Sequence, residues 1–138
     1  MTPFECAQKE WGIGVKEITG KKHNPRIVWY ASFTTYKATD DETPWCSSFM
    51  CAMAFLGGQP STKSAAAKSW LDYGLPGDGS KGDIVVFKRS GGHHVAFVNK
   101  PFKTGDKVIN VLGGNQGNAV SIMDYDAKNI LGFRRFAV

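Results

Sequence analysis

The chain has 138 residues, which is the size of one ordinary domain and too short for two domains of normal size. Its 42% hydrophobic and 21% charged residues are typical of a soluble globular protein, and no stretch approaches the about 20 apolar residues that cross a bilayer, so we expect neither a disordered chain nor membrane insertion. Lys and Arg outnumber Asp and Glu by 17 to 12, and the net charge of +5 favours polyanionic partners such as nucleic acid, anionic lipid or bacterial cell wall.

The placement of basic residues, the cysteine spacing and the N-terminal sequence each exclude one further kind of protein. The basic residues are scattered and do not interleave with aromatic ones, so we expect no nucleic-acid partner. The three cysteines, Cys6, Cys46 and Cys51, are an odd number without CxxC spacing, so they indicate neither a disulfide framework nor a zinc knuckle. The first ten residues contain no basic segment followed by an apolar one, so we expect no secretory signal peptide.

The first half of the sequence is predicted to be helical. At three places a polar residue that can cap a helix precedes a proline, whose missing N–H is not needed in the first helical turn. Glu5 adds a capping box to the first of these starts. A fourth helix is predicted in an alanine-rich stretch that ends before Gly74, a residue suited to a left-handed C-terminal conformation. The capping pairs are Thr2-Pro3, Asn24-Pro25 and Thr43-Pro44, and the predicted helices cover 3–11, 25–34, 44–56 and 63–73.

From Gly82 onward the pattern changes to short β-branched or aromatic runs separated by Gly, Asn and Asp, which is typical of strands. Helices followed by a meander of antiparallel strands indicate one α+β domain over residues 1–138, with the helices packed on one face of the sheet. The predicted strands cover 84–87, 94–98, 107–112, 119–123 and 131–136.

Cys46 lies at the head of the third predicted helix. If Thr43 caps this helix, Cys46 falls in its first turn, where free backbone N–H groups and the helix dipole stabilise a thiolate. We therefore expect a pKa below the ordinary value of about 8.5 and a nucleophilic thiol. Cys51 faces about 140° away on a regular helix and is assigned to the core. The alternative for Cys46 is also a core position, because free cysteine is among the most buried residues.

A cysteine nucleophile needs a base, and the base often needs an orienting partner. His23 lies in a polar loop and is interpreted as a solvated residue, whereas His93 and His94 open a predicted strand. Because side chains alternate across a sheet, only one of this pair can face the helices, and the spacing does not tell which. Asn115 follows the next strand, where it can either hold the imidazole or serve as an ordinary turn residue.

Several motifs occur in a specific order over nearly the whole chain. They are the helix-start cysteine within 41–47, Gly82-Asp83 before an apolar strand, the run 94–98, and Val-Leu-Gly-Gly-Asn-Gln at 111–116, together with the segments 14–18, 24–27, 64–71 and 131–135. This order resembles the CHAP and NlpC/P60 superfamily of papain-like cell-wall amidases and peptidases, and is closest to a small CHAP-like subfamily found in phage lysins and bacteria. The resemblance implies a papain-like α+β fold with N-terminal helices packed on a C-terminal antiparallel sheet.

The resemblance also implies roles for single residues. Cys46 is then the nucleophile, His94 the general base, and Asn115 the residue that orients the histidine. Two positions depart from the family pattern, since many CHAP domains have a glutamate at the position of Gly113 and a glutamine at the position of Trp45. The second departure leaves the oxyanion donor unassigned beyond the backbone N–H of Cys46.

Other side chains are candidates for binding. Trp45, Trp70 and Tyr73 are predicted to line a substrate groove, with core packing as the alternative. Some CHAP domains bind calcium through aspartates before the cysteine. Residues Asp40, Asp41 and Glu42 lack that spacing and are interpreted as a solvated turn, so we expect no metal and no other cofactor.

The function implied by the resemblance is cleavage of an amide bond of bacterial peptidoglycan, either as an N-acetylmuramoyl-L-alanine amidase or as a peptide endopeptidase. We expect a monomeric phage endolysin, made in the cytoplasm of a bacterial host and brought to the wall by holin release or as part of a virion. An injected antibacterial amidase effector is one alternative, and a non-catalytic cell-wall or glycan-binding module on the same scaffold is another. A metal site of Cys46, Cys51, His93 and His94 is disfavoured, because each pair is predicted to face apart.

Overall fold

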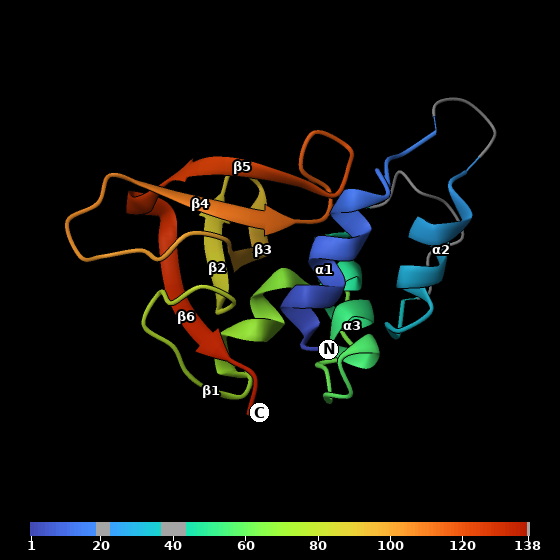
Figure 1. Ribbon diagram of the computed structural model, residues 1–138, viewed down its shortest axis with the longest axis horizontal. Helices are drawn as coiled ribbons and strands as arrows, with labels where there is room; N and C mark the ends of the chain where they lie inside the picture. The colour runs from blue at the N-terminus through green and yellow to red at the C-terminus, as the bar shows by residue number, and fades with distance from the viewer. Residues whose placement is uncertain (19–22, 37–43, 138) are drawn as a thin grey trace.

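The computed structural model describes residues 1–18, 23–36 and 44–137, and within them the helices that precede the first strand lie on one side of a six-stranded antiparallel sheet (Figure 1). This arrangement confirms the predicted α+β class. Among the described helices, none combines the length and apolar character needed to cross a membrane. The helices are α1 (Pro3–Gly12), α2 (Pro25–Ala31), α3 (Cys46–Leu56), η1 (Ala67–Asp72) and η2 (Ala127–Asn129), and the strands are β1 (Leu75–Pro76), β2 (Ile84–Arg89), β3 (Gly92–Val98), β4 (Val108–Gly113), β5 (Ser121–Asp126) and β6 (Ile130–Arg135).

The first two helix starts confirm the predicted caps. The Thr2 hydroxyl accepts a hydrogen bond from the Glu5 N–H at 3.1 Å, and the Glu5 carboxylate accepts one from the Thr2 N–H at 2.9 Å, which completes the capping box. The Asn24 side chain accepts a hydrogen bond from the Arg26 N–H at 2.8 Å, and Pro25 is the first residue of α2. These caps were predictable because each involves residues within three positions of one another.

The other two helices differ from the prediction. Helix α3 begins at Cys46 rather than Pro44, with Trp45 as its N-cap and no side-chain cap, and Thr43 lies outside the described residues. The predicted helix over 63–73 is a 3-10 helix over Ala67–Asp72 only. Lys63 has φ +57°, and the Ser64 hydroxyl accepts from the Ala66 N–H, so local hydrogen bonds replace the first helical turn. Gly74 has φ +60°, the left-handed conformation expected of it.

The strand order is β1-β6-β2-β3-β4-β5. The predicted meander is therefore confirmed for β2 through β5, whereas β6 returns to pair with β2 and β1 was not predicted. Strand β3 pairs with β4 only through Phe97 with Leu112 and Val98 with Val111. The β3–β4 pairing thus does not extend to Val95 or to the residues that precede it in β3. This first part of β3 faces the start of α3 and the loop that follows β4.

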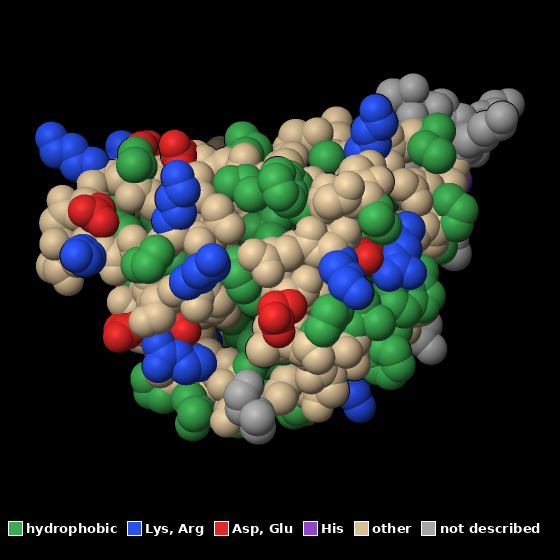
Figure 2. Space-filling view, in the orientation of Figure 1, with side chains coloured by type: hydrophobic (Ala, Val, Ile, Leu, Met, Phe, Trp, Pro, Cys, Tyr) green, Lys and Arg blue, Asp and Glu red, His purple; other side chains and the backbone are tan. Residues whose placement is uncertain are grey.

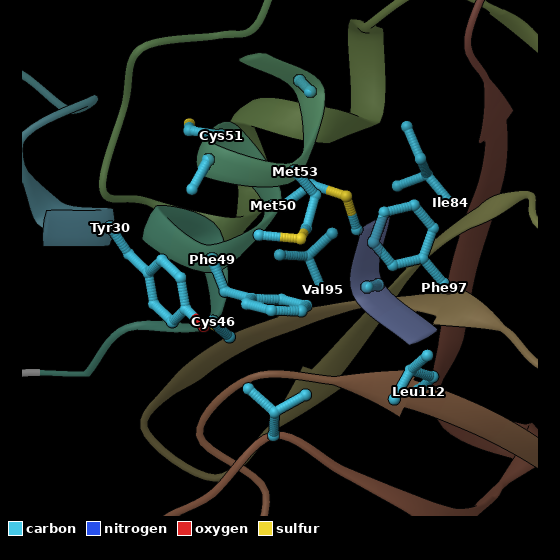
Figure 3. Close-up of a cluster of buried hydrophobic side chains, with 14 of the residues drawn as sticks. Tyr30, Cys46, Phe49, Met50, Cys51, Met53, Ile84, Val95, Phe97 and Leu112 are labelled. Atoms are coloured by element: carbon cyan, nitrogen blue, oxygen red, sulfur yellow. The ribbon is translucent and has the colours of Figure 1, made fainter. Parts of the chain in front are cut away.

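Both faces of the sheet are covered by apolar side chains. On the helix side, Phe49, Met50 and Met53 of α3 lie in one buried cluster with Ile84, Val95, Phe97 and Leu112 of the sheet (Figure 3). On the other face a second cluster forms around Val85, Phe87, Ala96 and Val98, with Tyr125 packed against it. Because side chains alternate along β3, His94 lies on the second face, where its ring centroid is 6.2 Å from Phe87 and 5.4 Å from Tyr125.

Candidate functional site

Cys46 is the first residue of α3 and is buried, with 6% of its surface exposed. Its thiol interacts with the backbone N–H of Val95, and with the N–H groups of Cys46 and Ser47 in the first helical turn. The thiol thus lies against β3 one residue from His94, at the place where the ladder with β4 has ended. The expectation of a helix-start thiol is met, although the helix begins two residues later than predicted.

The pKa of Cys46 differs from the expectation. Burial raises the pKa of the thiol, and this outweighs the hydrogen bonds from the Val95 and Ser47 N–H groups and the positive charge of Arg89, each of which lowers it. The prediction of a lowered pKa was therefore wrong, because the helix start is covered by protein rather than open to water. At neutral pH the residue is a thiol and not a thiolate.

His94 has 1% of its surface exposed, and its Nε2 lies 2.9 Å from Oε1 of Gln116. Burial lowers the pKa of His94 to about 4, while the hydrogen bond with Gln116 raises it and the nearby charge of Arg89 lowers it further. His94 is therefore neutral at pH 7, with one ring nitrogen protonated and the other carrying a lone pair. His93, the other histidine of the pair, is half-buried.

The surroundings of Gln116 determine which nitrogen of His94 is protonated. The Gln116 amide nitrogen donates to the carbonyl of Ser121 at 2.7 Å, and the Ser121 hydroxyl donates to the Gln116 carbonyl at 2.7 Å. Because a carbonyl only accepts, the Gln116 NH₂ group must point to Ser121 and its Oε1 to His94. Nε2 of His94 is then the donor, and Nδ1 holds the lone pair that can accept a proton.

Gln116, not Asn115, is therefore the partner of the histidine. Asn115 is half-buried, has φ +58° and lines the pocket beside His94, but the hydrogen bond to the ring comes from its neighbour. This corrects the role predicted for Asn115. The sequence signal was present as two adjacent amides after β4, and only the path of the loop decides which of them is turned inward.

Gly113 and Gly114 allow the loop after β4 to pack closely against β3 and α3. A Cβ at Gly113 would lie 2.7 Å from Oε1 of Gln116 and 2.9 Å from Cβ of Ala96. A Cβ at Gly114 would lie 2.7 Å from Cβ of Phe49, in the first turn of α3. A side chain at position 113 would therefore displace Gln116 from the ring of His94.

A pocket of about 240 Å³ opens beside the imidazole. Its lining includes Arg89 at the end of β2, and Nη1 of Arg89 lies 3.5 Å from Nδ1 of His94. Tyr125 also lines the pocket. Its pKa is raised, mainly by burial and to a smaller extent by Cys46, against the opposing effect of the positive charge of Arg89. Arg89, His94 and Tyr125 thus line one pocket, and Cys46 lies outside its lining but close enough for the charge of Arg89 to lower the pKa of its thiol.

The predicted aromatic groove is not found. Trp45 and Trp70 have 2% and 0% of their surface exposed, so both belong to the core, which corrects their assignment to substrate binding. The Trp45 indole donates to the Glu17 carboxylate at 2.8 Å and the Trp70 indole to the Ser47 hydroxyl at 2.9 Å. Tyr73 is half-buried, packs on Trp70 and donates its hydroxyl to the Pro60 carbonyl, away from His94.

The remaining candidates lie elsewhere. Cys51 is buried, with Sγ 4.0 Å from the Thr62 hydroxyl and 3.8 Å from the Ser64 carbonyl, as expected for a core thiol. No three His, Cys, Asp or Glu residues gather as metal ligands in the ranges 1–18, 23–36 and 44–137. The acidic residues 40–42 lie outside the described residues.

Comparison of the chain with models of protein families, with curated proteins and with solved structures finds no match. The site consists of a buried thiol at a helix start, a neutral histidine of defined tautomer, and a pocket beside that histidine.

Proposed function

We propose that this protein is a cysteine-dependent amide hydrolase that acts on bacterial peptidoglycan. Cys46 is the nucleophile, His94 the general base, and Gln116 the residue that orients the histidine. The observation that supports this most directly is the locked amide of Gln116, which leaves the lone pair of His94 on Nδ1. A buried hydrogen-bond network that selects one tautomer is what a general base requires and what a packing histidine does not need.

The proposed reaction starts from a neutral pair, because burial raises the pKa of Cys46 and lowers the pKa of His94. As Sγ attacks the amide carbonyl, Nδ1 of His94 takes the thiol proton and the carbonyl oxygen becomes an oxyanion. The C–N bond then breaks, and the imidazolium returns the proton to the leaving amine. Water, activated by the same Nδ1, attacks the thioester and releases the acid. Gln116 Oε1 stabilises the imidazolium through the Nε2–H bond.

The start of α3 supplies donors for the oxyanion. The N–H groups of Cys46 and Ser47 are in the first helical turn, where no intrahelical carbonyl accepts from them. Loss of one such donor typically costs about 3 kcal/mol of barrier. In the proposed enzyme one helix end therefore positions the nucleophile and binds the developing charge.

The substrate class rests on the motif resemblance and on charge. Two features support the papain-like arrangement that the resemblance implies: helices pack on an antiparallel sheet, and the helix-start cysteine lies against the backbone of the strand that carries His94. The net charge of +5 favours an anionic wall. Lys and Arg are spread over the face seen in Figure 2 rather than gathered in one patch, so attraction to the wall would be general and selectivity would come from the pocket. A phage endolysin and an injected effector are both settings in which such an enzyme works.

A non-catalytic wall-binding module is the second candidate, and one observation favours it. The thiol is buried and its pKa is raised, which is the state of a structural cysteine. In that case the pocket beside His94 would hold a wall fragment without cleaving it.

Digestion of purified peptidoglycan separates the two candidates. The wild type, Cys46→Ala, His94→Ala, Gln116→Ala and His93→Ala would be incubated with walls of several chemistries, and released fragments identified by mass spectrometry. The proposal predicts release by the wild type and His93→Ala, loss with Cys46→Ala and His94→Ala, and slow release with Gln116→Ala. The fragment masses name the bond. If the wild type sediments with the wall but releases nothing, the binding module replaces the enzyme.

A further inference from the structure

The pocket beside His94 has charged side chains of one sign only. Lys88 and Arg89 line it, and no Asp or Glu does. Its other polar lining includes the amides of Asn115, Gln116 and Asn129. A concave site of this composition attracts an anion and has neutral donors to orient it.

Arg89 is the member of this lining closest to the proposed chemistry. The ion pairs among the described residues join Arg26 to Glu10 and Arg135 to Asp78 and Asp83, and none includes Arg89. Its guanidinium instead approaches Nδ1 of His94, a neutral acceptor, at the long distance of 3.5 Å. Guanidinium has five N–H donors in a planar fork, and within the described part of the chain this approach to His94 is the one side-chain hydrogen bond of Arg89, which leaves the other donors for a ligand.

We propose that Arg89 is the specificity-determining residue of the site and that it binds a carboxylate of the substrate next to the scissile amide. The planar fork of arginine matches a carboxylate in a bidentate pair. This inference rests on the proposed function. Substrate binding would also affect the base. A carboxylate that binds the Arg89 guanidinium would draw the guanidinium away from Nδ1 of His94, and the lone pair on Nδ1 could then accept the Cys46 proton.

The test uses two muropeptides of the same sequence, one with a free carboxylate next to the scissile amide and the other with the matching carboxamide. Wild-type protein is expected to cleave the carboxylate form with a kcat/KM roughly ten- to a hundredfold higher, since a charged hydrogen-bonded pair is replaced by a neutral contact. The ratio of the two rates is the readout. A partly misfolded variant loses activity on both peptides equally and leaves this ratio unchanged.

Three variants locate the source of the preference. Arg89→Gln is expected to bring the ratio close to one, and Arg89→Lys to leave an intermediate ratio, because a lysine keeps the charge without the fork. Lys103→Gln is the matched control: it removes the same charge from an exposed loop position and should keep the wild-type ratio.

Two results would overturn the inference while leaving the proposed function intact: equal cleavage of both peptides by the wild type, or an unchanged ratio in Arg89→Gln. Failure of the wild type to cleave either peptide would instead count against the enzyme itself. Calorimetric binding of both peptides to Cys46→Ala then still tests Arg89, since tighter binding of the carboxylate form that disappears in the Cys46→Ala/Arg89→Gln variant supports the inference, and equal binding contradicts it.

Discussion

Oε1 of Gln116 lies 2.9 Å from Nε2 of His94, and the Gln116 amide is held in that orientation by the Ser121 carbonyl, 2.7 Å from its nitrogen. This pairing gives His94 a defined tautomer in a buried position. The consequences of this pairing, of the buried thiol and of the close-packed loop can each be measured.

If His94 is the proposed general base, replacing Gln116 by Ala should lower kcat by about tenfold or more, because the imidazole loses the acceptor that fixes its tautomer and supports its positive charge. Gln116→Glu keeps an acceptor at the same distance and should retain more activity than Gln116→Ala. Asn115→Ala should lower kcat by less than Gln116→Ala does. Steady-state kinetics on one soluble muropeptide would compare the three, and a larger loss at Asn115 would return the orienting role to that residue.

The stability of the protein should depend on pH through His94. The pKa of His94 is about 4 in the folded chain and about 6.5 when unfolded, so between these values the unfolded state binds more protons. Neutral His94 therefore makes its full contribution to stability above pH 6.5. As the pH falls toward 4, the free energy of unfolding should decrease by about 3 kcal/mol.

Urea unfolding of the wild type and His94→Gln from pH 7.5 to 4 would measure this loss. Carboxylates titrate in both proteins and cancel in the difference between the two curves. The difference should shrink toward acid pH, and parallel curves would mean that His94 titrates normally.

Cys46 should react slowly with iodoacetamide at pH 7 and faster as the pH rises above 9, because burial raises the pKa of its thiol. The modified residues would be identified by peptide mapping, since Cys6 and Cys51 are also buried. In Arg89→Gln the reaction of Cys46 should slow further, because a charge that favours the thiolate is removed. Rapid labelling of Cys46 below pH 7 would instead reveal a thiolate paired with an imidazolium.

Gly114→Ala should lower the free energy of unfolding by about 1–3 kcal/mol, because the new methyl group would meet Cβ of Phe49 at 2.7 Å and the ring of Trp45 at 2.8 Å. Gly92→Ala is the matched control, since a Cβ there meets nothing within 4 Å and φ is not positive. Thermal unfolding of both variants would check this. Equal stability of the two would show that the loop after β4 can move away from α3.

The features that the sequence predicted are those in which neighbouring residues interact. The capping box of Thr2 and Glu5 and the cap at Asn24 were confirmed, as was the change from helices to strands near Gly82. The return of β6 to β2 could not be predicted, because it joins residues about 50 positions apart in the chain, such as Ile84 and Arg134.

In the site, too, local features were predictable from the sequence and contacts between distant segments were not. The position of Cys46 at the start of a helix was predicted from the residues around it. The pKa of its thiol depends on burial beneath distant segments, and the predicted direction of the shift was wrong. The choice of Gln116 over Asn115 depends on the close approach of Gly113 to Ala96 and of Gly114 to Phe49, which no local pattern contains. The burial of Trp45 and Trp70 is likewise a property of the assembled fold.

The early end of the ladder between β3 and β4 gives Cys46 a second role. The Val95 N–H lies beyond the last β3–β4 residue pair and donates a hydrogen bond to the Cys46 thiol. The sulfur thus accepts from a strand N–H that has no partner in β4. An alanine at position 46 removes that acceptor and leaves a buried donor unsatisfied, at a cost of about 1–3 kcal/mol in stability. Cys46→Ser retains an acceptor of similar size, and it should therefore be more stable than Cys46→Ala while still lacking the thiol of the proposed nucleophile.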